Sequence, residues 1–417
     1  MSYGACCEPV RRTSGVREAI AIPLLLWPFA SACATDAPRV AEAVVRDSAG
    51  IAIVENPAAL ADRPFELRLS NEPVADIGVV DGAPEYQLSG VSSALPLADG
   101  RIVVVNAGTQ ELRFFDEAGT FINATGGSGE GPGEYRYPEV LRSPWPDSLI
   151  VYDNGHRRFS VLDTNGAFVR SITPNAYIGQ VVGLLGNGRA LSARSTAMAG
   201  PNSPEGMIPN QRIMSLMSLD AAREDTIGVF DGPDLFLWNR AGQIGFTAVP
   251  FDVSASGAAA GDRIWITPGR TPELREYDAA GTLLRIVRVL REPEPVTREL
   301  FDAYVGERVS RTDDPDQAAE IRRRYGHTPM RDAFPAYLRL IVSAESDVWA
   351  ERYRSEPGLP ATWTVFGADG RARGSITVPA GVGLRAVGDG RVVATRRDDL
   401  DVEHVVVWRL ENTVESD

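Results

Sequence analysis

Cysteine and histidine are both scarce in this chain of 417 residues. The three cysteines are Cys6, Cys7 and Cys33, so a chain cleaved before Cys33 would keep one thiol and could form no internal disulfide. The three histidines stand at positions 156, 327 and 404, and no two of them have the spacing of a metal-binding motif. Packing must therefore stabilise the fold, and the sequence predicts no cofactor.

Several functional motifs are also missing. The glycine-rich segment at 126–140, GGSGEGPGEYRYPEV, lacks the GK[ST] ending of a phosphate-binding loop and precedes a strand instead of a helix. No G-x-S-x-G elbow is present, so a serine hydrolase of that type is not indicated. A net charge of −14 argues against nonspecific binding of nucleic acid or anionic lipid, and the basic run at 322–324 is expected on a solvated helix face.

An export signal is indicated at the start of the chain. Three arginines precede the apolar run AIAIPLLLWPFASA at 19–32, and Cys33 follows it directly. Two prolines interrupt this run, and it is shorter than the roughly 20 apolar residues of a spanning helix. The small residues before Cys33 resemble a bacterial lipobox, so we expect residues 1–33 to be a signal peptide and Cys33 to be lipidated. Cleavage at the same site without lipidation is the alternative.

A repeated unit organises the rest of the chain. Each copy has an apolar strand, a second strand, a polar gap, a third strand that usually ends in Asp, a turn with Gly, and a fourth strand. Five copies have their second strands near 101–106, 148–153, 188–195, 262–267 and 346–353, and a sixth begins at 390–396. Four-stranded units at this spacing are typical of β-propellers, whereas a sandwich of generic hairpins would not repeat this order. We therefore predict an all-β, six-bladed β-propeller over residues 65–417.

The sixth copy lacks its last strand. It ends after EHVVVWRL at 403–410, and an open ring would expose unpaired strand edges. A spare strand, PVADIGV at 73–79, lies just before the first blade. We predict that this segment completes blade six. Residues 34–64 are expected to form a tether and N-terminal segment, since 34–48 show no strand alternation.

Between blades four and five the periodicity changes to that of helices. Residues 300, 301, 304 and 305 fall on one helical face, and Asp314 followed by Pro315 is typical of a helix start. About 30 residues are too few for an independent core, so the sequence predicts a helical insertion at 296–326.

The longer loops indicate where a ligand would bind. The turns at one end of the blades are short, whereas the connections at the other end are long, and such length favours binding. We expect the site on this face, built from 126–138, 153–157, 196–211, 397–404 and the insertion. Its candidate residues are Glu134, Arg136, Asp153, Asn154, His156, Arg157, Asp399, Asp401 and His404. Their acids would suit a cation or a hydroxyl-rich ligand, and the two arginines could orient a carboxylate, although turns select Asp and Asn in any case.

The stretch from Gly100 to Tyr135, GRIVVVNAGTQELRFFDEAGTFINATGGSGEGPGEY, resembles an NHL repeat. Asn106 stands where that pattern usually has Asp, whereas Asp153 preserves it. With PVTRELFDAYV, PAYLRL and DDLDVEHVVVWRL, the chain looks like the bacterial six-bladed β-propeller lipoproteins. That resemblance implies a propeller in the bacterial cell envelope, periplasmic or at the surface, and assigns no reaction.

Two enzyme classes share similar propellers. Peptidyl-amidoglycolate lyases hold zinc with pore histidines, a set that is hard to assemble here because His327 falls in the insertion. Gluconolactonase-like propellers hold a divalent cation with Glu, Asn and Asp, for which Glu134, Asn154 and Asp399 are candidates. Since a fold alone does not specify a reaction, we predict a binding scaffold, with a metal-dependent hydrolase or lyase as the alternative. The expected partner is a small molecule or an envelope protein, and the membrane is contacted only through the lipid.

Overall fold

The first complete repeat shows why each unit becomes a small sheet. Strand β6 (Ile102–Asn106) is a β-branched run and is buried along its whole length. It pairs antiparallel with β5 (Val91–Pro96) on one side and β7 (Glu111–Phe115) on the other, and β8 (Phe121–Gly126) completes the sheet. The outermost β8 alternates partly buried and exposed residues, because one of its faces meets solvent.

The aspartate that ends the third strand closes the turn that follows. Asp116 accepts hydrogen bonds from the backbone N–H groups of Ala118 (3.0 Å) and Thr120 (2.7 Å), and these bonds lower the pKa of its carboxyl group. Asp163 and Asp278 accept the same two bonds in their own blades. The recurrent Asp of the sequence pattern is therefore a turn residue.

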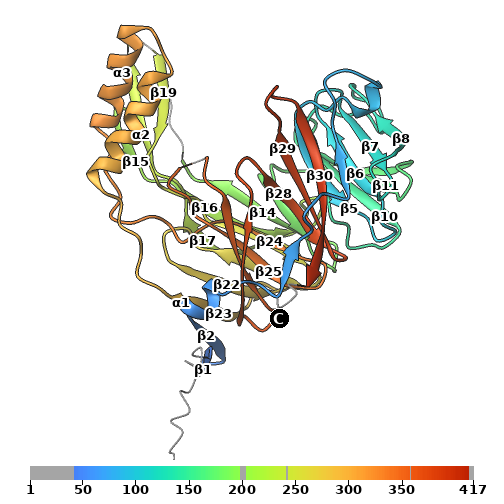
Figure 1. Cartoon of the computed structure of the whole chain (residues 1–417), viewed down its shortest axis with the longest axis horizontal. Helices are drawn as coiled ribbons and strands as arrows, with labels where there is room; N and C mark the ends of the chain where they lie inside the picture. The colour runs from blue at the N-terminus through green and yellow to red at the C-terminus, as the bar shows by residue number, and fades with distance from the viewer. Residues whose placement is uncertain (1–41, 198–202, 241–242, 357, 413–417) are drawn as a thin grey trace, which may run out of the picture. The chain divides into compact units, whose positions relative to one another are not determined.

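Six such sheets form the blades of the computed structural model (Figure 1), which describes residues 42–197, 203–240, 243–356 and 358–412. The innermost strands of blades one and two contact each other, as do those of successive blades from three to six, and β5 of the first blade also meets the last blade. These contacts confirm the predicted six-bladed propeller. Blades two to five consist of β9 (Pro138–Leu141), β10 (Ser148–Asp153), β11 (Arg158–Asp163) and β12 (Phe168–Ile172); β13 (Gln180–Leu184), β14 (Ala190–Ser195), β16 (Gln211–Met217) and β17 (Glu224–Asp231); β20 (Ser256–Ala260), β21 (Arg263–Thr267), β22 (Glu273–Asp278) and β23 (Leu283–Leu290); and β24 (Tyr337–Val342), β25 (Val348–Arg352), β26 (Ala361–Phe366) and β27 (Ala372–Val378).

The sixth blade closes the ring with N-terminal chain, as predicted. Its own strands are β28 (Gly383–Gly388), β29 (Arg391–Arg397) and β30 (Glu403–Asn412). Strand β4 (Ala75–Ile77) pairs antiparallel with β30, with Ile77 opposite Val405. The far end of β30 takes a second short partner, β3 (Leu67–Leu69), which the sequence did not indicate.

An N-terminal strap, defined here as residues 51–77, runs along the outer edges of three successive blades. Its first part, β2 (Ile51–Pro57), pairs in parallel with β23 of blade four. Helix α1 (Ala58–Asp62) follows, and the Phe65 N–H then donates to the Ser375 carbonyl of blade five (2.8 Å). Strands β3 and β4 end the strap on blade six.

The expected tether and N-terminal segment at 34–64 lies outside the described residues up to residue 41, and from residue 44 it forms strands. Strand β1 (Val44–Ser48) forms a hairpin with β2 through Ala49 and Gly50, which both have positive φ. Asn56 is fully buried, and its side chain hydrogen-bonds the backbone of Gly370 and Ala372 in blade five. Pairing with distant strands therefore orders a segment that lacks a strand pattern of its own.

The helical insertion lies where it was predicted, between blades four and five. Helix α2 (Arg298–Ser310) is capped by the Thr297 side chain, and α3 (Pro315–Gly326) by that of Asp314. Phe301 is buried in a small core with Phe251, Val296 and Phe334. None of the helices in the described residues is long and apolar enough to cross a membrane.

A three-stranded sheet stands beside the helices (Figure 1), and one of its strands lies in the segment 196–211 that was expected to be loop. It contains β15 (Gly206–Ile208), β18 (Leu235–Arg240) and β19 (Gln243–Ala248), which come from two long connections at blade three. The Arg324 guanidinium of α3 stacks on Trp238 at 3.6 Å, and the His327 ring stacks on Phe236 at 5.9 Å. These contacts hold the helices and the sheet together as one projection on the ring.

Candidate functional site

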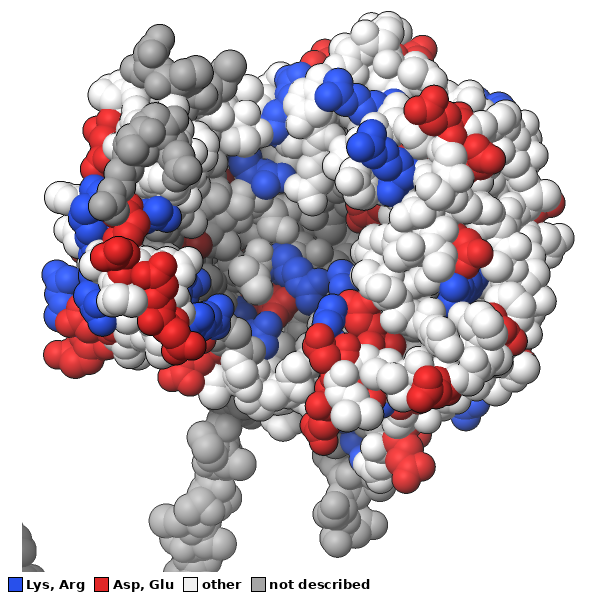
Figure 2. Space-filling model, turned by 90° about the horizontal axis from the view of Figure 1, so that it is seen from above, with Lys and Arg blue, Asp and Glu red and all other residues white. Residues whose placement is uncertain are grey.

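A cavity of about 610 Å³ lies at the centre of the ring, between the inner strands, and is called the central channel below. The inner strand of every blade contributes to its wall, from β5 in blade one to β28 in blade six. Figure 2 shows the end of the ring that carries the helical projection, with basic side chains in the central hollow. The cavity has the size of a small-molecule site, since such pockets span roughly 300–1,000 Å³.

Arginine supplies all the basic charge of the channel wall. Arg142 follows β9, Arg212 lies on β16, Arg339 on β24 and Arg385 on β28. Among the described residues, no carboxylate lies within ion-pair distance of Arg142, Arg212 or Arg385. Unpaired basic charge therefore gathers in the channel of a protein whose net charge is −14.

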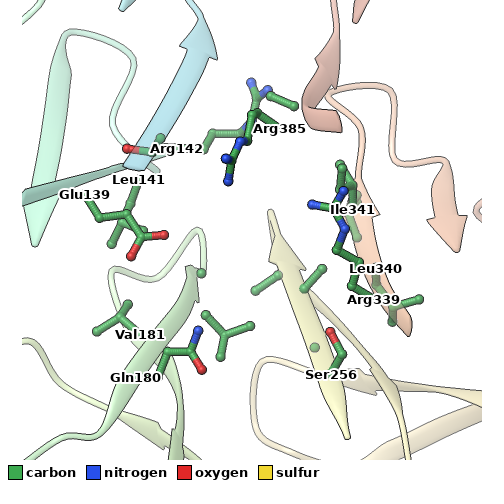
Figure 3. A pocket seen from close by; sticks show the side chains of 18 of the residues that line it. Glu139, Leu141, Arg142, Gln180, Val181, Ser256, Arg339, Leu340, Ile341 and Arg385 are labelled. Atoms are coloured by element: carbon green, nitrogen blue, oxygen red, sulfur yellow. The ribbon is translucent and has the colours of Figure 1, made fainter. Parts of the chain in front are cut away.

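Arg339 and Arg385 face the same space from neighbouring blades (Figure 3). Arg339 donates to Glu351 (2.6 Å) and to the Leu384 carbonyl (2.8 Å), whereas the Arg385 Nε donates to Thr395 Oγ1 (3.0 Å). Burial lowers the pKa of Arg385, repulsion from Arg339 lowers it further, and two nearby glutamates oppose the shift. The guanidinium stays charged, so an anion between these two arginines would relieve their repulsion.

Glu139 is the one acid of this wall that makes no ion pair or hydrogen bond with the described part of the chain. Its side chain is open to the channel and points toward the space between the strands (Figure 3). Confinement by the surrounding strands raises its pKa, and attraction to Arg385 only partly offsets that effect. Glu139 and Arg385 thus interact across a gap without touching.

A second charged cluster joins the channel wall to the base of the projection. The Asp252 carboxylate is almost fully buried and pairs with Arg270 (2.8 Å) and with Arg331. Arg331 also pairs with Asp234 at 2.6 Å. Because these opposite charges satisfy one another, the cluster fixes the projection to the ring instead of offering free charge to a ligand.

The sequence-predicted residues of blade two form a structural turn. Asp153 is fully buried and accepts backbone hydrogen bonds from Arg136 (2.9 Å), Tyr137 (3.0 Å) and Gly155 (2.9 Å). The His156 ring Nδ1 lies 2.7 Å from the same carboxylate. Burial opposes the shift, but these bonds outweigh it and lower the pKa of Asp153. The carboxylate is therefore fully occupied within the protein.

The other candidates near that turn are exposed. The Glu134 carboxylate accepts a bond from the Gly131 N–H (2.7 Å), and the Asn154 N–H donates to the Tyr137 carbonyl (3.1 Å). The Arg136 and Arg157 guanidinium groups lie over the rings of Tyr137 (5.7 Å) and Tyr177 (5.6 Å). Cation–aromatic contacts leave such groups free to bind a ligand as well.

The candidates of blade six form a separate group. His404 contacts Asp76 (2.7 Å) on the ring-closing strand, and Asp401 pairs with Arg397 (2.8 Å). Asp399 is exposed to solvent. In the described ranges no hydrogen bond or ion pair connects this group to the candidates of blade two, and no group of three or more His, Cys, Asp or Glu side chains is arranged to hold a metal. Cys33, the predicted lipidation site, lies outside the described residues.

Sequence reasoning missed the channel residues because nothing distinguishes them locally. Glu139, Arg339 and Arg385 each lie in a short apolar strand, in the runs PEVL, YLRLIV and GLRAVG. A charged residue inside an otherwise apolar inner strand is the sequence feature that could have indicated these channel residues. The missed residues share that feature, whereas the predicted ones came from polar loops.

Comparison with known proteins agrees with this architecture. Residues 85–142 match the model of a protein family described as a six-bladed β-propeller. The chain is a six-bladed β-propeller. No curated protein matches the chain significantly.

Solved structures with a similar arrangement come from several bacteria. A proposed exported protein from Bacteroides fragilis NCTC 9343 is 10% identical, with a TM-score of 0.47, over 86% of this chain and 100% of that chain. A DUF4221 family member from Bacteroides vulgatus ATCC 8482 is 10% identical, with a TM-score of 0.49, over 84% and 99%. Virginiamycin B lyase from Staphylococcus aureus is 9% identical, with a TM-score of 0.38, over 82% and 99%. Likeness at this level does not assign an activity or a ligand to the propeller.

Proposed function

We propose that this chain is an exported, lipid-anchored propeller of the bacterial envelope that binds a small anionic ligand in its central channel. The observation that carries the proposal is the set of arginines that face the channel without a carboxylate partner. Arginine suits carboxylates and phosphates because its planar group donates two parallel hydrogen bonds. A confined channel also strengthens such contacts, since less water screens the charges.

This proposal differs from the sequence prediction in the charge of the expected ligand. The acids of the predicted site favoured a cation, whereas the unpaired charge of the channel is mainly basic. Asp153 is occupied by its own turn, and His404 and Asp401 are engaged by Asp76 and Arg397. The channel therefore supports a binding function better than the rim does, and none of its described residues forms an acid–base pair with a nucleophile.

Replacing Arg385 by glutamine should weaken anion binding by at least about tenfold, because a charge-assisted hydrogen bond contributes roughly 1.5–3 kcal/mol. Isothermal titration calorimetry of the purified protein with glutarate, L-glutamate and inorganic phosphate checks this. Arg170→Gln, an exposed change on the outer strand β12, is the matched control and should leave affinity unchanged. Failure of all three anions to bind, or equal affinity of wild type and R385Q, would contradict the channel assignment.

Replacing Cys33 by alanine should move the protein from the membrane fraction to the soluble periplasmic fraction. The reason is that an acyl chain provides the membrane attachment, at about 0.8 kcal/mol per buried CH₂ group. Fractionation of cells followed by immunoblotting measures the shift, with a Ser31→Ala variant as a control that retains the thiol. Unchanged membrane association of the Cys33→Ala protein would show that lipid at Cys33 is not the anchor.

A further inference from the structure

The channel holds one acid that its arginines do not neutralise. Glu139 faces Arg385 across the cavity. The attraction between the two groups lowers the pKa of Glu139 and raises the pKa of Arg385, although burial acts in the opposite direction on each. Their side chains nevertheless make no ion pair in the described structure, although both point toward the same space (Figure 3). A gap of this kind, between opposite charges in a cavity, is a place for a ligand with charges of its own.

The Glu139 carboxylate is also free to bind a group of the ligand. It lies at the second position of β9, it is open to the cavity, and no side chain of the described residues donates a hydrogen bond to it. A purely anionic ligand would meet repulsion here. A ligand that carries a cation near its anionic group would instead pair with Glu139 and with the arginines at once.

We propose that the ligand is a zwitterion with a carboxylate and a primary ammonium group, namely an acidic amino acid or a short acidic peptide. The proposal rests on the anion-binding function argued above. Arg385 and Arg339 receive the carboxylate, and Glu139 receives the ammonium group. Ammonium suits Glu139 better than a hydroxyl group does, because it both donates hydrogen bonds and neutralises a confined charge.

The surrounding charge favours a ligand with negative charge in excess. Like Arg385, both Arg142 and Arg212 lack a carboxylate partner among the described residues, and the Arg212 Nε is buried without a hydrogen-bond partner. Arg212 is held toward the cavity by a bond to the Gln180 side chain (2.8 Å). A second carboxylate on the ligand, as in glutamate, would pair with these guanidinium groups, whereas a neutral amino acid would leave them unpaired.

Three probes separate this proposal from anion binding in general. L-Glutamate, N-acetyl-L-glutamate and glutarate all carry two carboxylates, but only glutamate has an ammonium group. Calorimetry with the full-length protein should give about tenfold tighter binding of glutamate than of the other two. Glu139→Gln should abolish that preference while keeping or improving the affinity for glutarate, and Arg385→Gln should weaken all three. The control Glu72→Gln, at an exposed position, should behave like wild type.

Each other result has a definite meaning. If glutarate binds as tightly as glutamate, or if Glu139→Gln leaves the preference intact, the zwitterion proposal is wrong and the anion-binding function stands. If none of the three probes binds at millimolar concentration, the anion-binding function fails together with it. Thermal unfolding of Glu139→Gln, expected to match wild type because the carboxylate has no partner, shows that any loss arises in the site.

Discussion

Replacing Ile77 by alanine is expected to lower the free energy of unfolding by about 2–5 kcal/mol. Ile77 lies on the ring-closing strand opposite Val405 and is 1% exposed, in a core shared by blades one and six. Removing its side chain would leave a cavity at the junction of the first and last blades. Chemical denaturation with a two-state fit measures the loss.

Val80 offers a matched control close to Ile77 in the sequence. Its side chain is 60% exposed, so Val80→Ala should change the free energy of unfolding by no more than about 0.5 kcal/mol. Gly78→Ala should be as harmful as Ile77→Ala, because an added Cβ would lie 2.4 Å from the Glu403 carbonyl oxygen. Equal stability of the Ile77→Ala and Val80→Ala proteins would show that β4 does not close the ring.

Replacing Asp153 by asparagine should lower the free energy of unfolding by about 2–4 kcal/mol without changing the affinity for anions. The asparagine amide would turn a donor toward backbone N–H groups that now donate to the carboxylate. Asp399→Asn, at an exposed position of the other predicted group, should leave stability unchanged. A stable Asp153→Asn protein that loses ligand would support the original sequence hypothesis instead.

The same substitution changes the response to pH. The fold lowers the pKa of Asp153 below its ordinary value of 3.8, because the backbone hydrogen bonds outweigh the effect of burial. A group of this kind stabilises the protein above its unfolded pKa and loses that contribution as the pH falls through its folded pKa. Wild type should therefore lose stability more steeply than Asp153→Asn as the pH falls below about 4, as measured by thermal melts.

The repeat made most of the fold predictable. Each blade is a local unit whose strands alternate with turns, so the recurring Asp and Gly could be read directly from the sequence. The closing strand could be predicted by counting strands, because blade six had only three of its four strands and one strand-like segment had no blade of its own. The hairpin of β1 and β2 could not be predicted, since its partner β23 lies more than two hundred positions away and supplies the pairing that the segment's own pattern lacks.

The candidate site was harder to predict for a related reason. Polar loops attract attention, but Asp153 and Asp116 show that the fold uses such residues for its turns. Glu139 and Arg385 become neighbours only when the ring is closed, because they lie on inner strands of different blades. The meaning of a charge in an inner strand thus depends on residues that are distant in sequence.

The N-terminal strap has a consequence for the order in which the chain folds. The strap pairs with β23 of blade four, with Ser375 of blade five and with β30 of blade six. All three partners are synthesised long after the strap itself. In blades one to three each strand pairs with strands that are close to it in the sequence. The loss of loop-closure entropy is therefore small, and these blades can form early. The strap, which leaves the ribosome before any blade, is expected to pair last. Until β30 has emerged, a chain exported as proposed above would carry unpaired edges on its first strands, and these edges would need protection from aggregation.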